Sequence, residues 1–124
     1  MKQNTMLIVD DEQKFVEMLA RRLELRGIKC SFCFDGQSGI QKVKDSTFDM
    51  VLLDLRLPDI YGIEVLKEMK KIREDIKVLI LTGHGTDEDR VKCLELGAYK
   101  FMQKPVNIED LLIIMNKING ADNK

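Results

Sequence analysis

Short apolar runs alternate along this chain with segments whose apolar residues recur at helical spacing, and this alternation restricts the fold more than any other feature. The runs have the length of strands, whereas the segments between them repeat apolar residues every three or four positions. The clearest runs are residues 5–9, 50–53 and 78–81, and the clearest helical segments are residues 15–23 and 111–118. The sequence therefore predicts right-handed strand–helix–strand units, that is, an α/β protein with a parallel sheet covered on both faces.

The predicted strands differ in character, and this difference suggests their order. The three runs above are continuously apolar, as central strands buried on both faces require, whereas residues 28–34 and 98–102 are mixed, as edge strands are. Placing these two outermost gives the flavodoxin-like order 2-1-3-4-5 in a three-layer sandwich with five helices on both faces. We expect one domain over residues 1–120, followed by a polar tail at residues 121–124.

Three residues mark the ends of predicted helices. Gly27 and Gly97 follow helical segments where a residue with positive φ is often needed, and Asn107 precedes the last helix as an N-cap.

The charge balance argues against whole classes of partner. The chain has 20 basic and 21 acidic residues and a net charge of -1, so it has no basic field to attract nucleic acid or anionic lipid. The apolar run near the N-terminus is too short for a signal peptide, and no stretch approaches the length of a membrane span. We expect a cytoplasmic protein with no direct contact to nucleic acid or membrane.

The cysteines form no obvious redox or metal pair. Cys30 and Cys33 lie in a predicted strand, where residues three apart point to opposite faces of the sheet. Cys93 is far away in the sequence, so we expect three reduced thiols that serve in packing.

Polar residues follow four of the five predicted strands. Ligands of open α/β sheets bind beyond the carboxyl ends of the strands, near the reversal in strand order. We therefore expect one site, to which separate loops contribute Asp10, Asp11 and Glu12, then Asp54, then Thr82, Gly83 and His84, and finally Lys104 and Pro105.

The chemistry of such a site can be argued from charge. Two carboxylates about 4 Å apart repel by about 4 kcal/mol at an effective dielectric constant near 20, so Lys104 and a divalent cation are needed to offset them. Hard oxygen ligands favour Mg²⁺ or Mn²⁺ over Zn²⁺. Asp54 could then attack a phosphorus atom while Lys104 and the Thr82 hydroxyl neutralise the charge on the transferred group, which gives an aspartyl phosphate.

Four motifs in order carry a family resemblance that covers the chain nearly end to end. They are IVDDE at residues 8–12, LDLRLPDIYG at 53–62, LTGHG at 81–85 and GAYKFMQKP at 97–105. The chain closely resembles the receiver domain of two-component response regulators, of the kind found in chemotaxis regulators.

The resemblance implies roles for residues around the acceptor. It implies Asp54 as phosphoacceptor and metal ligand, Asp11 as a direct Mg²⁺ ligand, Asp10 as a ligand mostly through water, and the backbone carbonyl of Arg56 as a further ligand. The side chains of Arg56 and His84 lie where they can affect water access to the phosphoryl group.

The resemblance also implies a switch. Lys104 and Thr82 would contact the phosphoryl group, the Lys104–Pro105 peptide would be cis, and Phe101 would swing inward as the Thr82 hydroxyl moves. Phe101 stands where many relatives have tyrosine, so any hydrogen bond through a ring hydroxyl is absent.

The implied function is that of a phosphorylation-dependent signalling switch rather than an enzyme that turns over an external substrate. The phosphoryl donor would be a sensor histidine kinase or a phosphotransfer protein. The surface of the fourth helix, fifth strand and fifth helix would then change its contacts with a downstream protein, a fused output domain or a second copy in a phosphorylation-linked dimer. No output segment follows the last predicted helix, so we expect a stand-alone regulator or a receiver cut from a longer chain.

Simpler interpretations of the same residues remain open. Asp11 and Glu12 could cap a helix, Thr82 could cap a turn, His84 could be a solvated loop residue, and Phe101 could be an ordinary core aromatic.

Two other functions are compatible with the architecture. A flavin- or nucleotide-binding module would need amides after the first strand, where this chain has acids that repel phosphate. A Mg²⁺-dependent phosphohydrolase with an aspartyl nucleophile is the closer alternative. Enzymes of that haloacid-dehalogenase-like class carry a second Asp two residues after the nucleophile, where this chain has Arg56, and a substrate-capping region for which it has no residues to spare.

Overall fold

The computed structural model describes residues 3–122 and contains one parallel sheet of five strands in the order β2-β1-β3-β4-β5, which confirms the predicted order. The strands are β1 (Asn4–Val9), β2 (Ile28–Cys33), β3 (Met50–Leu53), β4 (Val78–Thr82) and β5 (Lys100–Gln103). The helices are α1 (Gln13–Leu25), α2 (Gly36–Asp45), α3 (Gly62–Ile72), α4 (Asp87–Glu95) and α5 (Ile108–Asp122). Strands and helices alternate without exception in the described chain, as the apolar pattern indicated.

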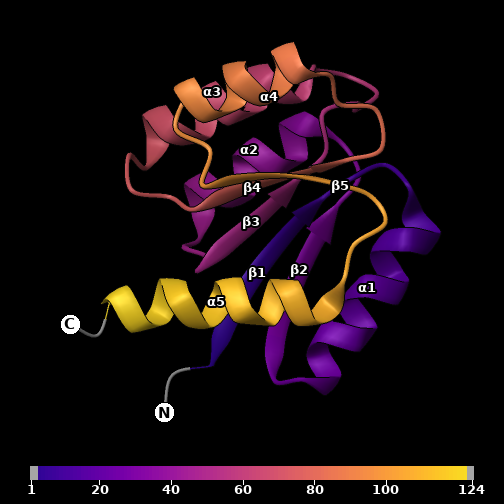
Figure 1. Ribbon diagram of the computed structural model, residues 1–124, viewed down its shortest axis with the longest axis vertical. Coiled ribbons are helices and arrows are strands. Elements are labelled where there is room, and N and C mark those ends of the chain that lie inside the picture. The colour runs from indigo at the N-terminus through magenta and orange to yellow at the C-terminus, as the bar shows by residue number, and fades with distance from the viewer. Residues whose placement is uncertain (1–2, 123–124) are drawn as a thin grey trace.

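Helices cover both faces of the sheet, with α1 and α5 on one side and α2, α3 and α4 on the other (Figure 1). Successive residues of a strand point to opposite faces, so β1 sends Leu7 and Val9 into the core beneath α2 and α3, and Met6 and Ile8 into the core beneath α1 and α5. All four side chains are fully buried or nearly so. The continuous apolar runs are therefore what a sheet with two covered faces requires.

The last strand differs from its predicted bounds. Residues 98–102 were expected, but β5 begins at Lys100 and ends at Gln103. Ala98 is buried like a strand residue, yet its backbone N–H donates to the carbonyl of Cys93 at the end of α4, and Tyr99 donates to Val78. Ala98 is buried because it lies in the turn after α4. The apolar pattern alone cannot distinguish a buried turn residue from a buried strand residue.

The helices end or begin where Gly27, Gly97 and Asn107 predicted. Gly27 and Gly97 have φ angles of 87° and 98°, a region that residues with a Cβ rarely adopt. The Asn107 side chain accepts the backbone N–H of Glu109 at 2.9 Å, as an N-cap does. The helix that it caps, α5, extends to Asp122, and residues 123 and 124 of the expected tail lie outside the described residues.

The cysteines are all free, and Cys33 and Cys93 are buried whereas Cys30 is only partly buried. Cys33 belongs to the core beneath α2 and α3, whereas Cys30 packs against the core beneath α1 and α5, so the two thiols lie on opposite faces as predicted. Burial raises the pKa of Cys30 to about 12 and those of Cys33 and Cys93 to about 11, so all three stay protonated at neutral pH.

None of the helices within residues 3–122 combines the length and the apolar character needed to cross a bilayer.

Candidate functional site

Asp54 is a buried carboxylate at the carboxyl end of the central strand β3, with 6% of its surface exposed. Its backbone N–H donates to the carbonyl of Val9, which fixes it beside the end of β1, and its side chain accepts the N–H of Arg56 at 3.4 Å. The lack of a side chain at Gly62 allows the chain after β3 to pass close to the backbone of Asp54 and Leu55. Gly62 donates its N–H to the Leu55 carbonyl at 2.7 Å, so the start of α3 lies directly against the segment that follows β3.

The loop between β1 and α1 supplies two further carboxylates. Asp10 is 3% exposed, and one of its oxygens accepts the N–H of Glu12 at 3.0 Å. Glu12 occupies the N-cap position of α1 but makes no side-chain capping bond there. Its carboxylate instead contacts Lys104, so helix capping does not account for this acid.

Lys104 connects the three carboxylates. Its ammonium lies 2.7 Å from Asp10 and 3.3 Å from Asp54 and also contacts Glu12. The residue follows β5, its N–H donates to the carbonyl of Thr82, and its peptide bond to Pro105 is cis. Side chains from three loops that are distant in the sequence thus meet at one edge of the sheet.

The pKa shifts show how burial and charge compete in this cluster. Burial raises the pKa of Asp10 above its ordinary value of 3.8, and the negative charge of Asp54 adds to the rise, although hydrogen bonds from Lys104 and Glu12 oppose it. Burial alone would lower the pKa of Lys104, but its hydrogen bonds to Asp10 and Glu12 and the charges of Asp10 and Asp54 outweigh burial and raise it. Burial thus makes the charge on Asp10 unfavourable for folding, whereas the contacts of Lys104 favour its ammonium form.

Replacing Asp10 by asparagine is expected to stabilise the metal-free protein. The pKa of Asp10 is higher in the folded than in the unfolded chain, so its ionised form costs stability above the folded-state pKa, and this cost disappears as the pH falls below 3.8. Asparagine keeps an acceptor for Glu12 and carries no charge. Urea denaturation with a chelator present should show a gain in unfolding free energy at pH 7 that shrinks toward pH 3.

Asp11→Asn is the matched control for this prediction, because the neighbouring Asp11 side chain is exposed and its substitution should change stability little. An Asp10→Asn protein no more stable than the wild type at pH 7 would contradict the electrostatic account.

The donor set fits a hard divalent cation. Carboxylate oxygens of Asp10, Glu12 and Asp54 all lie within 4.8 Å of one another. In their ionised forms, three carboxylates and one ammonium leave two net negative charges, which is the charge a divalent cation would balance. Asp10 and Asp54 are buried, and Glu12 lies at the exposed rim. All of these ligands are hard oxygens, and none of the three thiols belongs to the group.

Thr82 and Phe101 lie together beside this cluster. Thr82 is fully buried at the end of β4, and its hydroxyl accepts the N–H of His84 at 3.4 Å. Phe101 is half-buried and packs against the core beneath α2 and α3. A Cβ added to Gly85 would lie 2.9 Å from the Thr82 methyl group and in contact with the Phe101 ring, so the missing side chain at Gly85 leaves room for both.

The structure does not bring every expected residue into the cluster. Asp11 and His84 are exposed, and the Asp11 carboxylate is not part of the close group of oxygens. Arg56 is exposed and contacts Asp54 through its backbone N–H. Glu12, one of the acids after the first strand, contacts Lys104, a contact that the sequence did not predict.

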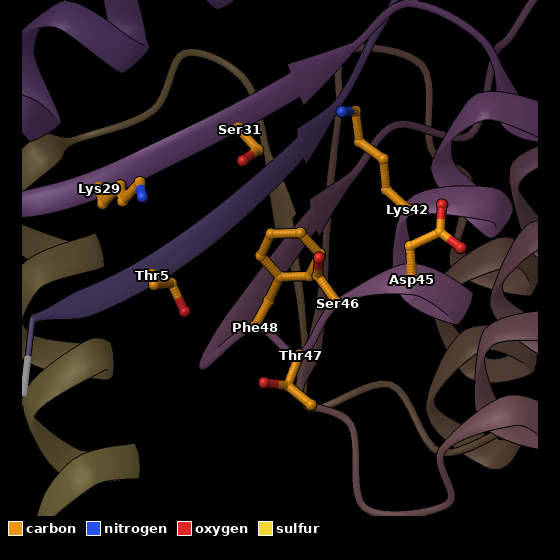
Figure 2. Close-up of a pocket in the computed structure, with 8 residues that line it drawn as sticks. All are labelled: Thr5, Lys29, Ser31, Lys42, Asp45, Ser46, Thr47 and Phe48. Carbon is orange, nitrogen blue, oxygen red and sulfur yellow. The ribbon is translucent and has the colours of Figure 1, made fainter.

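A separate hollow of about 360 Å³ opens at the amino ends of the strands β1 and β3, next to β2 and α2 (Figure 2). Two lysines and one aspartate give it mixed charge, and none of the expected site residues lines it. Its lining consists of Thr5, Lys29, Ser31, Lys42, Asp45, Ser46, Thr47 and Phe48.

Residues 6–116 match the family described as response regulator receiver domain. The chain belongs to this family. It is 40% identical over 107 residues to the transcriptional regulatory protein CpxR homolog of Haemophilus influenzae, an alignment that covers 86% of this chain and 46% of that protein. It is also 35% identical over 107 residues to the transcriptional regulatory protein CusR of Escherichia coli, covering 86% and 47%.

A solved structure supports the same family. The fold is similar to that of a response regulator receiver domain protein (CheY-like) from Methanospirillum hungatei, with a TM-score of 0.92, 31% identity and coverage of 98% of both chains. The chain spans about half the length of the curated relatives named above.

Receiver domains of response regulators are phosphorylated on an aspartate in two-component signalling and generally act as phosphoacceptor switches. This chain is a receiver domain, and the phosphohydrolase alternative is not favoured.

Proposed function

We propose that Asp54 is the residue of this receiver domain that accepts the phosphoryl group, from a sensor histidine kinase or a phosphotransfer protein. The observation that carries the proposal is the position of its buried carboxylate, which ends the central strand and shares the Lys104 ammonium with Asp10. In the transfer, an Asp54 oxygen forms a bond to phosphorus while the bond from phosphorus to the donor breaks, and the donor leaves with that electron pair.

Carboxylates of this edge of the sheet would hold Mg²⁺, for which Mn²⁺ can substitute. Asp10, Asp11 and Asp54 would serve with the backbone carbonyl of Arg56, and the contact between Glu12 and Lys104 supports a role for Glu12 at the rim. When bound, the cation neutralises charge on the oxygens of the transferred group. The two uncompensated negative charges of the cluster support this assignment.

Lys104 and Thr82 stabilise the phosphorylated state. Oxygens added at Asp54 offer acceptors to the Lys104 ammonium and to the Thr82 hydroxyl, both of which donate. A Thr82 hydroxyl that turns to donate leaves its contact with the His84 N–H, and its methyl group moves with it. The Thr82 methyl group and the Phe101 ring both lie next to Gly85. A movement of the methyl group therefore changes the space that the ring can occupy.

The output surface consists of α4, β5 and α5. Its helices expose apolar side chains that a soluble domain usually buries, including Val91 and Leu94 on α4 and Ile113 on α5, the last 53% exposed. Tyr99, just before β5, adds an exposed aromatic ring. A downstream protein, a fused output domain or a second copy of the chain would bind this surface when Asp54 is phosphorylated.

Incubation of the wild-type protein with acetyl phosphate and Mg²⁺ is expected to add one phosphoryl group by intact-mass analysis. A chelator should abolish the gain, because without a divalent cation the site keeps its negative charge and repels the donor. No gain of mass in Mg²⁺ would contradict the proposal, and steady hydrolysis of a generic phosphatase substrate would favour the phosphohydrolase alternative.

A further inference from the structure

An aromatic ring lies against the Lys104 ammonium on the α1 side of the site. The nitrogen is 4.6 Å from the centroid of the Phe15 ring. Phe15 belongs to the first turn of α1, is half-buried, and packs against the core beneath α1 and α5. The Lys104 side chain is itself only 14% exposed. The ammonium is therefore enclosed between the three carboxylates and an aromatic face, with little water around it.

The ring and the carboxylates act on the ammonium in different ways. The face of an aromatic ring is electronegative and attracts a cation, and the attraction is stronger when water is excluded. Metal binding or phosphorylation changes the charge and the partners of the carboxylates, whereas the ring is uncharged and its attraction persists. A leucine at this position would keep most of the apolar packing but attract no cation.

We propose that Phe15 is a positioning residue that holds the Lys104 ammonium at the phosphoacceptor site. The proposal rests on the proposed function of Asp54 and adds a residue to it. The helix supplies a rigid support, since Phe15 is anchored in the core on one side and contacts the cation on the other. Lys104 is thereby directed toward Asp54 before any phosphoryl group arrives, and less ordering is needed during the transfer.

The test compares Phe15→Leu, which keeps apolar packing, with Phe15→Tyr, which keeps the aromatic face. In the wild type the ring should shift the NMR signals of the Lys104 ε-methylene protons upfield. Phe15→Leu should abolish that shift and slow labelling by acetyl phosphate about fivefold, and Phe15→Tyr should restore both.

Phe34→Leu is the matched control. Phe34 is also half-buried and packs against the same core, but its ring pairs with Phe32 at a centroid distance of 5.7 Å. Its substitution should lower stability much as Phe15→Leu does, while the labelling rate and the Lys104 signals remain those of the wild type.

Two results would overturn the role of Phe15: an unchanged labelling rate in Phe15→Leu, or equal slowing by Phe34→Leu. A wild-type protein that takes up no phosphoryl group would instead refute the proposed function. The NMR signals of the Lys104 ε-methylene protons are recorded without a phosphoryl donor. They therefore test the contact with Phe15 even if Asp54 is not the phosphoacceptor.

Discussion

Asp54→Asn is expected to reduce phosphorylation by acetyl phosphate to background. Asparagine has nearly the same shape and can still accept the Arg56 N–H, so the fold around the end of β3 should persist. The amide oxygen carries no negative charge, however, and is too weak a nucleophile to attack phosphorus. Intact-mass analysis with Mg²⁺ should show a phosphoryl group on the wild type and none on Asp54→Asn or Asp54→Ala.

The control for this prediction is Asp45→Asn. Asp45 is an exposed carboxylate at the end of α2, beside the hollow at the amino ends of the strands (Figure 2). Its substitution should leave labelling at the wild-type level. Equal labelling of all four proteins would show that acetyl phosphate modifies another residue, and the assignment of Asp54 would be wrong.

The fold was predictable because its main signal is local. Buried parallel strands need continuous apolar runs, and amphipathic helices need apolar residues every three or four positions, so both appear in the sequence without reference to the partner element. The start of β5 was not predictable in this way. Ala98 is apolar and buried, but its hydrogen bond to Cys93 belongs to the end of a helix, and only the three-dimensional contact shows this.

The site was predictable in its position more than in its contacts. Parallel strands end at one edge, so Asp10, Asp54 and Lys104 had to lie near one another once the strand order was known. The contact of Glu12 with Lys104 could not be inferred, because Glu12 lies in the turn from β1 into α1, which has neither the period of a strand nor that of a helix. The direction of a side chain in such a turn depends on the groups around it. Phe15 has the spacing of an ordinary core residue of a helix, so its contact with Lys104 could not be inferred either.

Gly62→Ala is expected to be among the most destabilising substitutions in the chain. A Cβ at this position would lie 2.5 Å from the Leu55 Cα and would also collide with the carbonyl oxygen of Asp54. Both atoms belong to the backbone of the acceptor segment and cannot turn away as a side chain could. The start of α3 or the end of β3 must therefore move, and we expect a loss of about 3 kcal/mol in unfolding free energy, measured by urea denaturation.

Gly120→Ala makes the same chemical change and should have the opposite effect. Gly120 lies in α5, and a Cβ there would meet no atom within 4 Å, so alanine adds helix propensity without a collision. A gain of about 0.5–1 kcal/mol is expected at that position. If the two variants were equally stable, the close contact between Gly62 and the Asp54 backbone would not constrain the fold. A Gly62→Ala protein that remains folded but labels slowly would instead show that the displacement reaches the phosphoacceptor, because the atoms that must move are those that position the Asp54 carboxylate.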